Sequence, residues 1–197
     1  MKTKVLVVTG GIGSGKTMVA SMFKDLGVVI YNADNEAKLL MNTSPVLKEK
    51  IIALFGVKAY ENNLLNRSYI SRLVFSNKSL LIKLNSIVHP AVKIHFNEWL
   101  KFQNSPYVVK EVAILFEIGA ENAYNFILTV TAPKDIRIKR LVKRDGKSVQ
   151  EIKLIMSNQL DSSQQIKKSD FVINNTNLEK TRKRVYNIHN EIIKLCY

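Results

Sequence analysis

The chain is almost devoid of cysteine, since Cys196 is the only one among its 197 residues. A single cysteine excludes an internal disulfide and fits a reducing compartment, so we expect a cytoplasmic protein. No grouping of Cys, His or Asp has the spacing of a zinc site. Long apolar runs are also absent: the run that follows Lys4 is broken by Gly10 and Gly11, too early for a signal peptide or a membrane span.

Acidic residues are scarce as well. Thirty Lys and Arg face 16 Asp and Glu, which gives a formal net charge of +14. This excess fits either nucleic-acid binding or a pocket for a polyanionic small molecule set among solvated lysines. The sequence carries no aromatic platform motif, zinc finger or basic zipper, so we expect small-molecule substrates and no nucleic-acid partner.

The most informative feature that is present is Gly10-Gly11-Ile12-Gly13-Ser14-Gly15-Lys16-Thr17, which matches the phosphate-binding pattern GxxxxGK[ST]. Glycines let backbone N–H groups curl around an anion, and a helix that begins near Lys16 directs its positive end at the same place. Lys16 is expected to reach the β- and γ-phosphates of ATP, and Thr17 to offer its hydroxyl to Mg²⁺. The predicted ATP-binding residues of the loop are Gly11, Ile12, Gly13, Ser14, Gly15, Lys16 and Thr17.

The surroundings of the motif strengthen this interpretation. An apolar β-branched run over 4–9 precedes it, and apolar residues at helical spacing follow it as far as Gly27. Further strands are predicted at 28–31, 106–112, 126–131 and 171–173, with helices at 134–144, 149–160 and 177–195 between and after them. Strands that alternate with helices predict an α/β fold, a parallel sheet with helices on both faces.

The segment from Pro45 to Gln103 is almost wholly helical in pattern, with a turn between helices at 60–63. It is too long for a simple crossover. We therefore predict a single domain over 1–197, with a core formed by 1–40 and 104–197 and a helical acceptor-binding insertion over 41–103. The basic segment 140–160 is the predicted lid.

Phosphoryl transfer requires aligned reactants, compensation of phosphate charge and a group beside the acceptor hydroxyl. Asp34 follows a predicted strand on the edge where parallel sheets place ligands. Its carboxylate could accept the hydroxyl proton, hold Mg²⁺ through water, or do both; the structural alternative is an acid stabilised in the first turn of a helix.

Three further side chains, Arg140, Arg144 and His89, are candidates on chemical grounds. Arg140 and Arg144 project from one helical face, with Arg137 close to that face, and arginine suits the charge of a transferring phosphoryl group. The alternative is a solvated basic helix. His89, directly before Pro90, could bind a substrate phosphate or ribose; the alternative is a structural histidine that fixes a turn at a helix start.

Taken in order, these residues resemble the dephospho-coenzyme A kinase family. Besides the loop, Asn32-Ala33-Asp34 is similar to the Asp-Ala-Asp of that family. The further matches are Asn66-Arg67, Val74-Phe75, Leu84-Asn85-Ser86-Ile87-Val88-His89-Pro90, Leu115-Phe116-Glu117, Arg140-Leu141, Arg144-Asp145-Gly146, Gln159, Ser169-Asp170-Phe171-Val172-Ile173 and Asn175.

The resemblance implies a P-loop kinase fold with a helical coenzyme-A-binding region and a lid, and ATP-dependent phosphorylation of the ribose 3′-hydroxyl of dephospho-coenzyme A. It implies Asp34 as the base, Lys16 as the phosphate lysine and Arg144 as a lid arginine, and it puts Arg67 and His89 on the acceptor side.

The chain departs from the family pattern at a few positions. Asn32 replaces the first aspartate of Asp-Ala-Asp. Ala113 and Ile114 replace the Pro and Leu that precede Leu-Phe-Glu, and Gln165 and Ser169 replace the common Lys and Ala. The catalytic core is kept, so an active enzyme is expected.

Two other functions stay open from the residues: a P-loop kinase with a different acceptor, and a nucleotide-dependent switch or nucleic-acid-binding NTPase. Oligomeric state is not indicated by the sequence.

Overall fold

A computed structural model describes residues 2–197, apart from the side chains of Phe75, Ser76 and Lys78. Phe75, half of the Val74-Phe75 match, is thus described by its backbone alone. The chain forms two compact units: one runs up to Asn32 and resumes over Gln103–Tyr197, and the other is Ala33–Phe102. Each unit is taken by itself below.

The first unit is built on a parallel five-stranded sheet in the order β2-β5-β1-β6-β7. Its strands are β1 (Lys4–Thr9), β2 (Ile30–Asn32), β5 (Tyr107–Glu111), β6 (Phe126–Thr131) and β7 (Phe171–Asn174). All four pairings are parallel, so every strand ends at the same edge of the sheet. The predicted parallel α/β sheet is confirmed.

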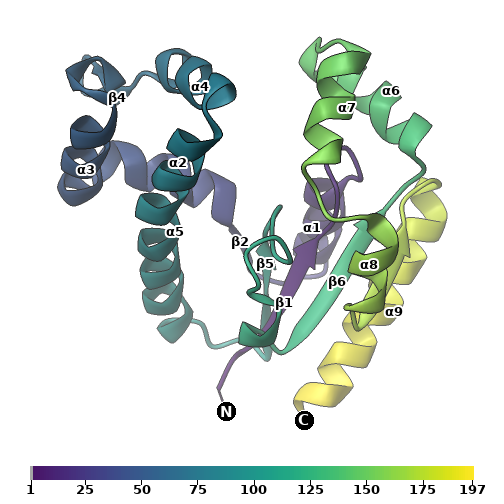
Figure 1. Ribbon diagram of the computed structural model, residues 1–197. Coiled ribbons are helices and arrows are strands. Elements are labelled where there is room, and N and C mark those ends of the chain that lie inside the picture. The colour runs from purple at the N-terminus through teal and green to yellow at the C-terminus, as the bar shows by residue number, and fades with distance from the viewer. Residues whose placement is uncertain (1) are drawn as a thin grey trace. The chain divides into compact units, whose positions relative to one another are not determined.

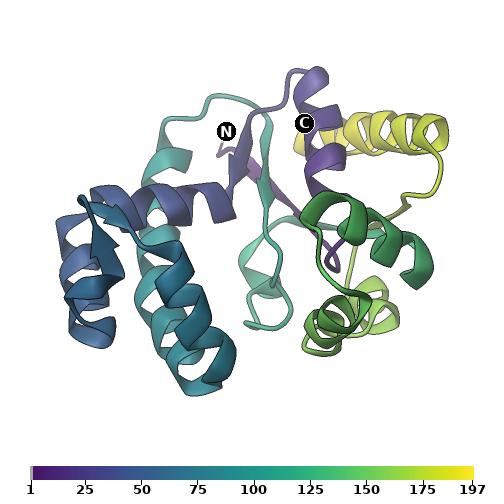
Figure 2. The same ribbon diagram turned by 90° about the horizontal axis from the view of Figure 1, so that it is seen from above.

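Helices cover both faces of this sheet, as Figures 1 and 2 show. Helices α1 (Lys16–Asp25) and α9 (Leu178–Cys196) lie side by side on one face, and the short helix α8 (Ser162–Lys167) packs against β6 on the other. Because both faces are covered, β1 is a nearly continuous apolar run buried from Val5 onward.

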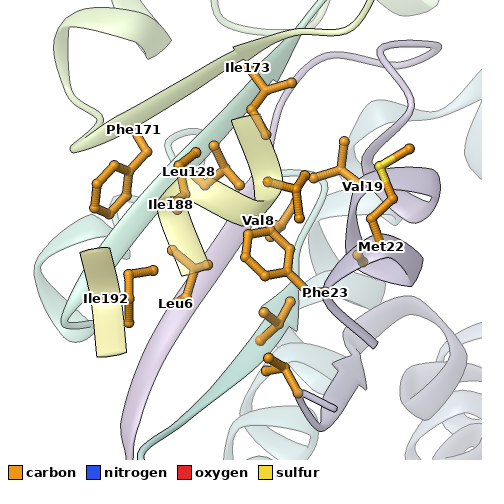
Figure 3. Close-up of a cluster of buried hydrophobic side chains, with 14 of the residues drawn as sticks. Leu6, Val8, Val19, Met22, Phe23, Leu128, Phe171, Ile173, Ile188 and Ile192 are labelled. Atoms are coloured by element: carbon orange, nitrogen blue, oxygen red, sulfur yellow. The ribbon is translucent and has the colours of Figure 1, made fainter. Parts of the chain in front are cut away.

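The main core of this unit lies between the sheet and helices α1 and α9 (Figure 3). Leu6, Val8 and Leu128 project from the strands, Phe23 comes from α1, and Ile188 comes from α9, each with no more than a trace of exposed surface. This packing fixes the end of β1 and the start of α1, and so anchors both ends of the glycine loop between them.

The basic segment after β6 forms α6 (Lys134–Asp145) and α7 (Val149–Ser157), followed by α8. Helix α7 starts at a capping box in which Ser148 and Glu151 satisfy each other's backbone N–H groups. The expectation of one helix over 149–160 is wrong at its end: α7 stops at Ser157, and Asp161 caps the separate helix α8.

The second unit is mainly helical, with α2 (Ala33–Thr43), α3 (Pro45–Phe55), α4 (Arg67–Ser76) and α5 (Lys78–Lys101). A turn does occur where residues 60–63 predict one, with Asn62 and Asn63 both at positive φ. It joins two short antiparallel strands, β3 (Tyr60–Glu61) and β4 (Leu64–Leu65), rather than two helices. Paired residues at positive φ are typical of tight hairpin turns. Short 3₁₀ turns are η1 (Val57–Ala59) here and η2 (Glu121–Ala123) in the first unit.

The structural alternative for His89 is wrong in one respect. His89 and Pro90 do not start a helix; Pro90 lies inside α5, which continues to Lys101. Proline removes one backbone hydrogen bond there. The helix continues through it because Val88, Val92 and Phe96 are buried on one face, so tertiary packing outweighs the local cost.

Within residues 2–197, no helix combines the length and the apolar character needed to cross a membrane.

Candidate active site

The glycine loop lies between β1 and α1, at the edge of the sheet where the strands end. Gly15 takes a left-handed conformation directly before α1, and a Cβ at this position would overlap the side-chain amide of Asn175. A Cβ on Gly11 would likewise overlap the guanidinium of Arg137. The positive φ of Gly15 therefore favours glycine at that position, whereas a side chain at Gly11 would displace the Arg137 guanidinium.

Inside the loop, Lys16 Nζ donates to the carbonyl oxygens of Gly10 at 2.9 Å and of Gly11 at 3.4 Å. Lys16 and Thr17 begin α1, so their backbone N–H groups have no acceptor within the helix. Among the described residues, the hydroxyl of Ser14 is buried without a hydrogen-bond partner. An ammonium group, helix N-terminal amides and a hydroxyl therefore gather in one place, which is an arrangement suited to phosphate.

The outer side of the loop is held by donors from distant segments. A loop that turns its N–H groups inward must turn carbonyls outward, and these need partners of their own. Arg137 Nε donates to Ile12 O at 2.8 Å, and Arg140 Nη1 lies 3.3 Å from Ser14 O. Asn175 Nδ2, fully buried, also donates to Ser14 O at 2.8 Å. The carbonyls of Ile12 and Ser14 are thus satisfied by side chains.

Further contacts link the end of β7 to α6 and to α9. Arg140 Nη2 donates to Asn175 O at 2.8 Å, while the side-chain oxygen of Asn175 accepts from Thr181 at 3.2 Å. In addition, Ile12 N donates to Gln159 Oε1 at 2.8 Å. Both polar groups of the Ile12 backbone are therefore held by side chains that follow β6.

Glu111 ends β5 beside the loop and is 7% exposed. Its Oε1 accepts from the Thr17 hydroxyl and its Oε2 from the Asn32 amide, each at 2.6 Å. The register of the sheet causes this, since Asn32 pairs with Glu111 across β2 and β5. Asn32 occupies the position of an aspartate in the family pattern. Its amide donates to the Glu111 carboxylate, whereas an aspartate there would repel that carboxylate.

This edge offers oxygen ligands to a cation. Thr17 and Glu111 present a hydroxyl and a carboxylate, the hard donors that Mg²⁺ prefers, and two protein ligands suffice when phosphates and waters complete the shell. No group of three or more His, Cys, Asp and Glu in the described part of the chain could hold a metal ion. The residues fit a divalent cation carried by a phosphate ligand and do not fit a closed metal site.

The structure brings Arg137 and Arg140 to the loop, but it does not bring Arg144 there. Arg144 is exposed in the last turn of α6, and its guanidinium forms two hydrogen bonds with the neighbouring Asp145, at 2.6 and 2.9 Å. These bonds raise the pKa of Arg144 and lower that of Asp145. The expected catalytic role of Arg144 stays a prediction.

The three acceptor-side candidates belong to the second unit. Asp34 is exposed in the first turn of α2, and Arg67 is exposed at the start of α4. His89 is partly buried in α5: burial lowers its pKa, and the negative charge of Asp34 partly opposes that effect. The structure therefore brings Asp34 and His89 into electrostatic contact within this unit, and their roles in the reaction stay predictions.

Three contributors, Glu111, Asn175 and Gln159, had no assigned role from the sequence. Glu111 could have been found as an acid that ends a strand at the edge where the loop lies. Asn175 and Gln159 matched the family pattern, but their contacts to Ser14 and Ile12 span about 150 residues of sequence, with separations of 161 and 147. No local pattern could have indicated those contacts.

A phosphate-binding glycine loop follows a central parallel strand, and the helices after β6 bring cationic side chains to it. This combination defines a P-loop kinase. Shikimate kinase from Bacteroides thetaiotaomicron shares this fold, with a TM-score of 0.56 at 13% identity over 96% of this chain and 98% of its own.

The match to one family is much closer. The Dephospho-CoA kinase family model matches residues 4–180, and the chain belongs to that family. A Dephospho-CoA kinase of Porphyromonas gingivalis is 38% identical over 77% of this chain and 75% of its own length. One from Fusobacterium nucleatum is 34% identical over 94% and 96%. The solved Dephospho-CoA kinase from Campylobacter jejuni superposes with a TM-score of 0.72 at 27% identity, covering 96% of this chain and 97% of that one.

Proposed function

We propose that this protein transfers the γ-phosphoryl group of ATP to the ribose 3′-hydroxyl of dephospho-coenzyme A, which yields coenzyme A. The observation that carries this function is the loop whose inward groups suit phosphate and whose Ile12 and Ser14 carbonyls accept hydrogen bonds from distant side chains, in a chain of the Dephospho-CoA kinase family. The resemblance noted from the sequence and the family match agree on the reaction.

On the donor side, we assign Lys16 to the β- and γ-phosphates, where its compact charge offsets the charge of the transferring group. The amides of Gly13, Gly15 and Thr17 and the hydroxyl of Ser14 are assigned to the phosphate chain, whereas Ile12 N and Ser14 N already donate to Gln159 Oε1 and Gly11 O. Arg140, tied to Ser14 and Asn175, supports the loop beside the nucleotide. Because these groups are fixed before ATP arrives, they need no reorganisation during transfer.

Thr17 and Glu111 are the residues that would hold Mg²⁺ together with the phosphates of ATP. Bound there, Mg²⁺ supplies neutralisation of charge on the β- and γ-phosphate oxygens. Asn32 keeps the second carboxylate oxygen of Glu111 in a hydrogen bond and so holds the orientation of that side chain.

On the acceptor side, we assign Asp34 as the group that accepts the proton of the ribose 3′-hydroxyl as the oxygen attacks. His89, whose pKa is lowered by burial, is neutral near pH 7 and can donate or accept one hydrogen bond to the acceptor. Arg67 is exposed and suits an acidic group of dephospho-coenzyme A. Arg144 is assigned to the transferring phosphoryl group after release from Asp145.

The test is an assay of the purified protein with Mg-ATP and dephospho-coenzyme A, in which the product is identified by mass and by its 3′-phosphate. We expect equimolar ADP and coenzyme A. A 3′-deoxy acceptor is the matched control and should give neither. ATP turnover that is indifferent to dephospho-coenzyme A but stimulated by another alcohol would reject this acceptor and favour a different P-loop kinase.

A further inference from the structure

Arg137 is a charged side chain in a largely buried position beside the glycine loop. It is 9% exposed, and its only hydrogen bond among the described residues runs from Nε to Ile12 O. No carboxylate within the described part of the chain forms an ion pair with it. Burial without a negative partner lowers its pKa, which marks the energetic cost of holding the charge there.

The position of the guanidinium is well defined. It lies so close to Gly11 that a Cβ there would overlap it, and Arg137 also lines a cavity of about 580 Å³. Lys134 and Lys153 line the same cavity; the one acid on its wall, Asp161, already accepts from Ser163 N at the start of α8. Two lysines and one aspartate line this cavity besides Arg137, so its wall carries a net positive charge.

A buried cation without a counter-ion destabilises a fold unless something else compensates it. A neutral donor would satisfy the Ile12 carbonyl equally well, so the hydrogen bond alone does not explain an arginine. The charge has a use once a polyanion occupies the other side of the loop, because Coulomb attraction acts through the intervening peptide groups.

We propose that Arg137 is a positioning residue that strengthens binding of the ATP phosphates from behind the loop, through its charge and without touching them. The inference rests on the proposed function, since it assumes ATP on the inner side of the loop. It gives α6 two distinct contributions: Arg140 braces the loop at Ser14 and Asn175, and Arg137 supplies buried positive charge behind Gly11 and Ile12. Affinity should therefore depend on Arg137 more strongly as the ligand carries more negative charge.

The experiment compares Arg137→Gln, which keeps a donor for Ile12 O but removes the charge, with Arg137→Lys, which keeps the charge. Lys139→Gln is the matched control, because it removes one charge from the exposed face of the same helix. Affinities for ATP, ADP and AMP are measured by calorimetry without acceptor, and the thermal midpoint is measured without nucleotide.

For Arg137→Gln we expect ATP affinity to fall on the order of tenfold, ADP affinity to fall less and AMP affinity to change little. The nucleotide-free thermal midpoint should stay equal or rise, because an uncompensated buried charge has been removed. Arg137→Lys should retain most of the ATP affinity, and Lys139→Gln should leave all three affinities unchanged.

Three results would overturn the proposal: unchanged ATP affinity in Arg137→Gln, equal losses for ATP and AMP, or a Gln variant that binds ATP better than the Lys variant. The last result would assign the role to hydrogen-bond geometry. A failure of the proposed function is seen separately, as absence of coenzyme A formation by the unsubstituted protein, whereas the present inference is read from nucleotide affinities.

Discussion

The glycine loop of the first unit and the acceptor candidates of the second are built in opposite ways. Around the loop, Arg137, Glu111 and Asn175 are buried and hydrogen-bonded to it or to its neighbours. In the second unit, Asp34 and Arg67 are exposed. Packing thus already fixes the side chains around the loop, whereas solvent surrounds the two candidates of the second unit; on the proposed function, the residues around the loop need no reorganisation when ATP binds.

The largest expected effect in this comparison of the loop with the acceptor-side candidates is the loss of turnover on substitution of Asp34. We expect Asp34→Asn to lower turnover by about 10²–10⁴-fold, the range for loss of an aligned proton acceptor. ATP affinity should stay unchanged, because this residue lies outside the loop. Steady-state kinetics and calorimetry measure the two quantities. Glu36→Gln, in the same first turn of α2, controls for loss of a helix-stabilising acid and should turn over normally. An Asp34→Asn enzyme with near-normal turnover would remove this residue from the mechanism.

Lys16→Ala is the matching change on the donor side. Turnover should fall by about 10²–10³-fold, as when one preorganised charge-stabilising group is lost. ATP affinity should fall as well, because Lys16 binds phosphates in the ground state too. This joint loss separates a donor-side from an acceptor-side residue. Lys24→Ala, in the last turn of the same helix, should affect neither quantity. Full ATP affinity in Lys16→Ala would contradict the assignment of the loop.

Glu111→Gln tests the carboxylate that joins Thr17 and Asn32. We expect the Mg²⁺ concentration for half-maximal activity to rise by about 10–100-fold, the range found when groups that support metal ligands are changed. Binding of Mn²⁺ to the ADP-loaded protein, followed by electron paramagnetic resonance, should weaken in parallel. Glu179→Gln on α9 serves as the control. Unaltered Mn²⁺ affinity would show that Glu111 only orients Thr17.

Asn175→Ala tests how far the braced loop depends on its neighbours. The substitution leaves the Thr181 hydroxyl and one acceptor site of Ser14 O without this partner in a buried place. The free energy of unfolding should fall by about 1–3 kcal/mol, as measured by urea denaturation. The adjacent Asn174 is exposed, so Asn174→Ala should lower the free energy of unfolding much less. Equal losses in the two variants would mean that the buried contacts contribute nothing specific.

The smallest effect is expected for the pair Tyr107 and His189, which belongs neither to the surroundings of the glycine loop nor to the acceptor-side candidates. His189 Nδ1 lies 2.7 Å from the Tyr107 hydroxyl, and burial lowers the pKa of His189. The unfolded chain, with a histidine pKa of about 6.5, then takes up the proton more readily, so stability falls as the pH drops from 7 towards 5. His189→Gln should flatten that part of the stability–pH curve, with activity at pH 7.5 unchanged. An equally steep curve in the variant would exclude His189 as its source.

The fold class could be predicted because its signals are local. A buried strand, the glycine motif and a helix of the right period follow one another from Lys4 to Asp25, and the structure confirms each. The errors also have local causes. The turn at 60–63 was recognised, but its flanking strands are two residues each, too short to show a period. Pro90 suggested a helix boundary that buried neighbours override.

The family and the reaction could be predicted from local motifs, and so could a phosphate-binding role for the glycines, lysine and threonine of the loop, because neighbours in the chain specify their backbone conformation and chemistry. The groups behind the loop depend on tertiary packing. Arg137, Gln159 and Asn175 reach it from more than a hundred residues away. Glu111 meets Asn32 because parallel strands bring their ends to one edge. Hydrogen bonds and charges act through space, and a linear pattern carries no record of which distant groups the packed core brings together.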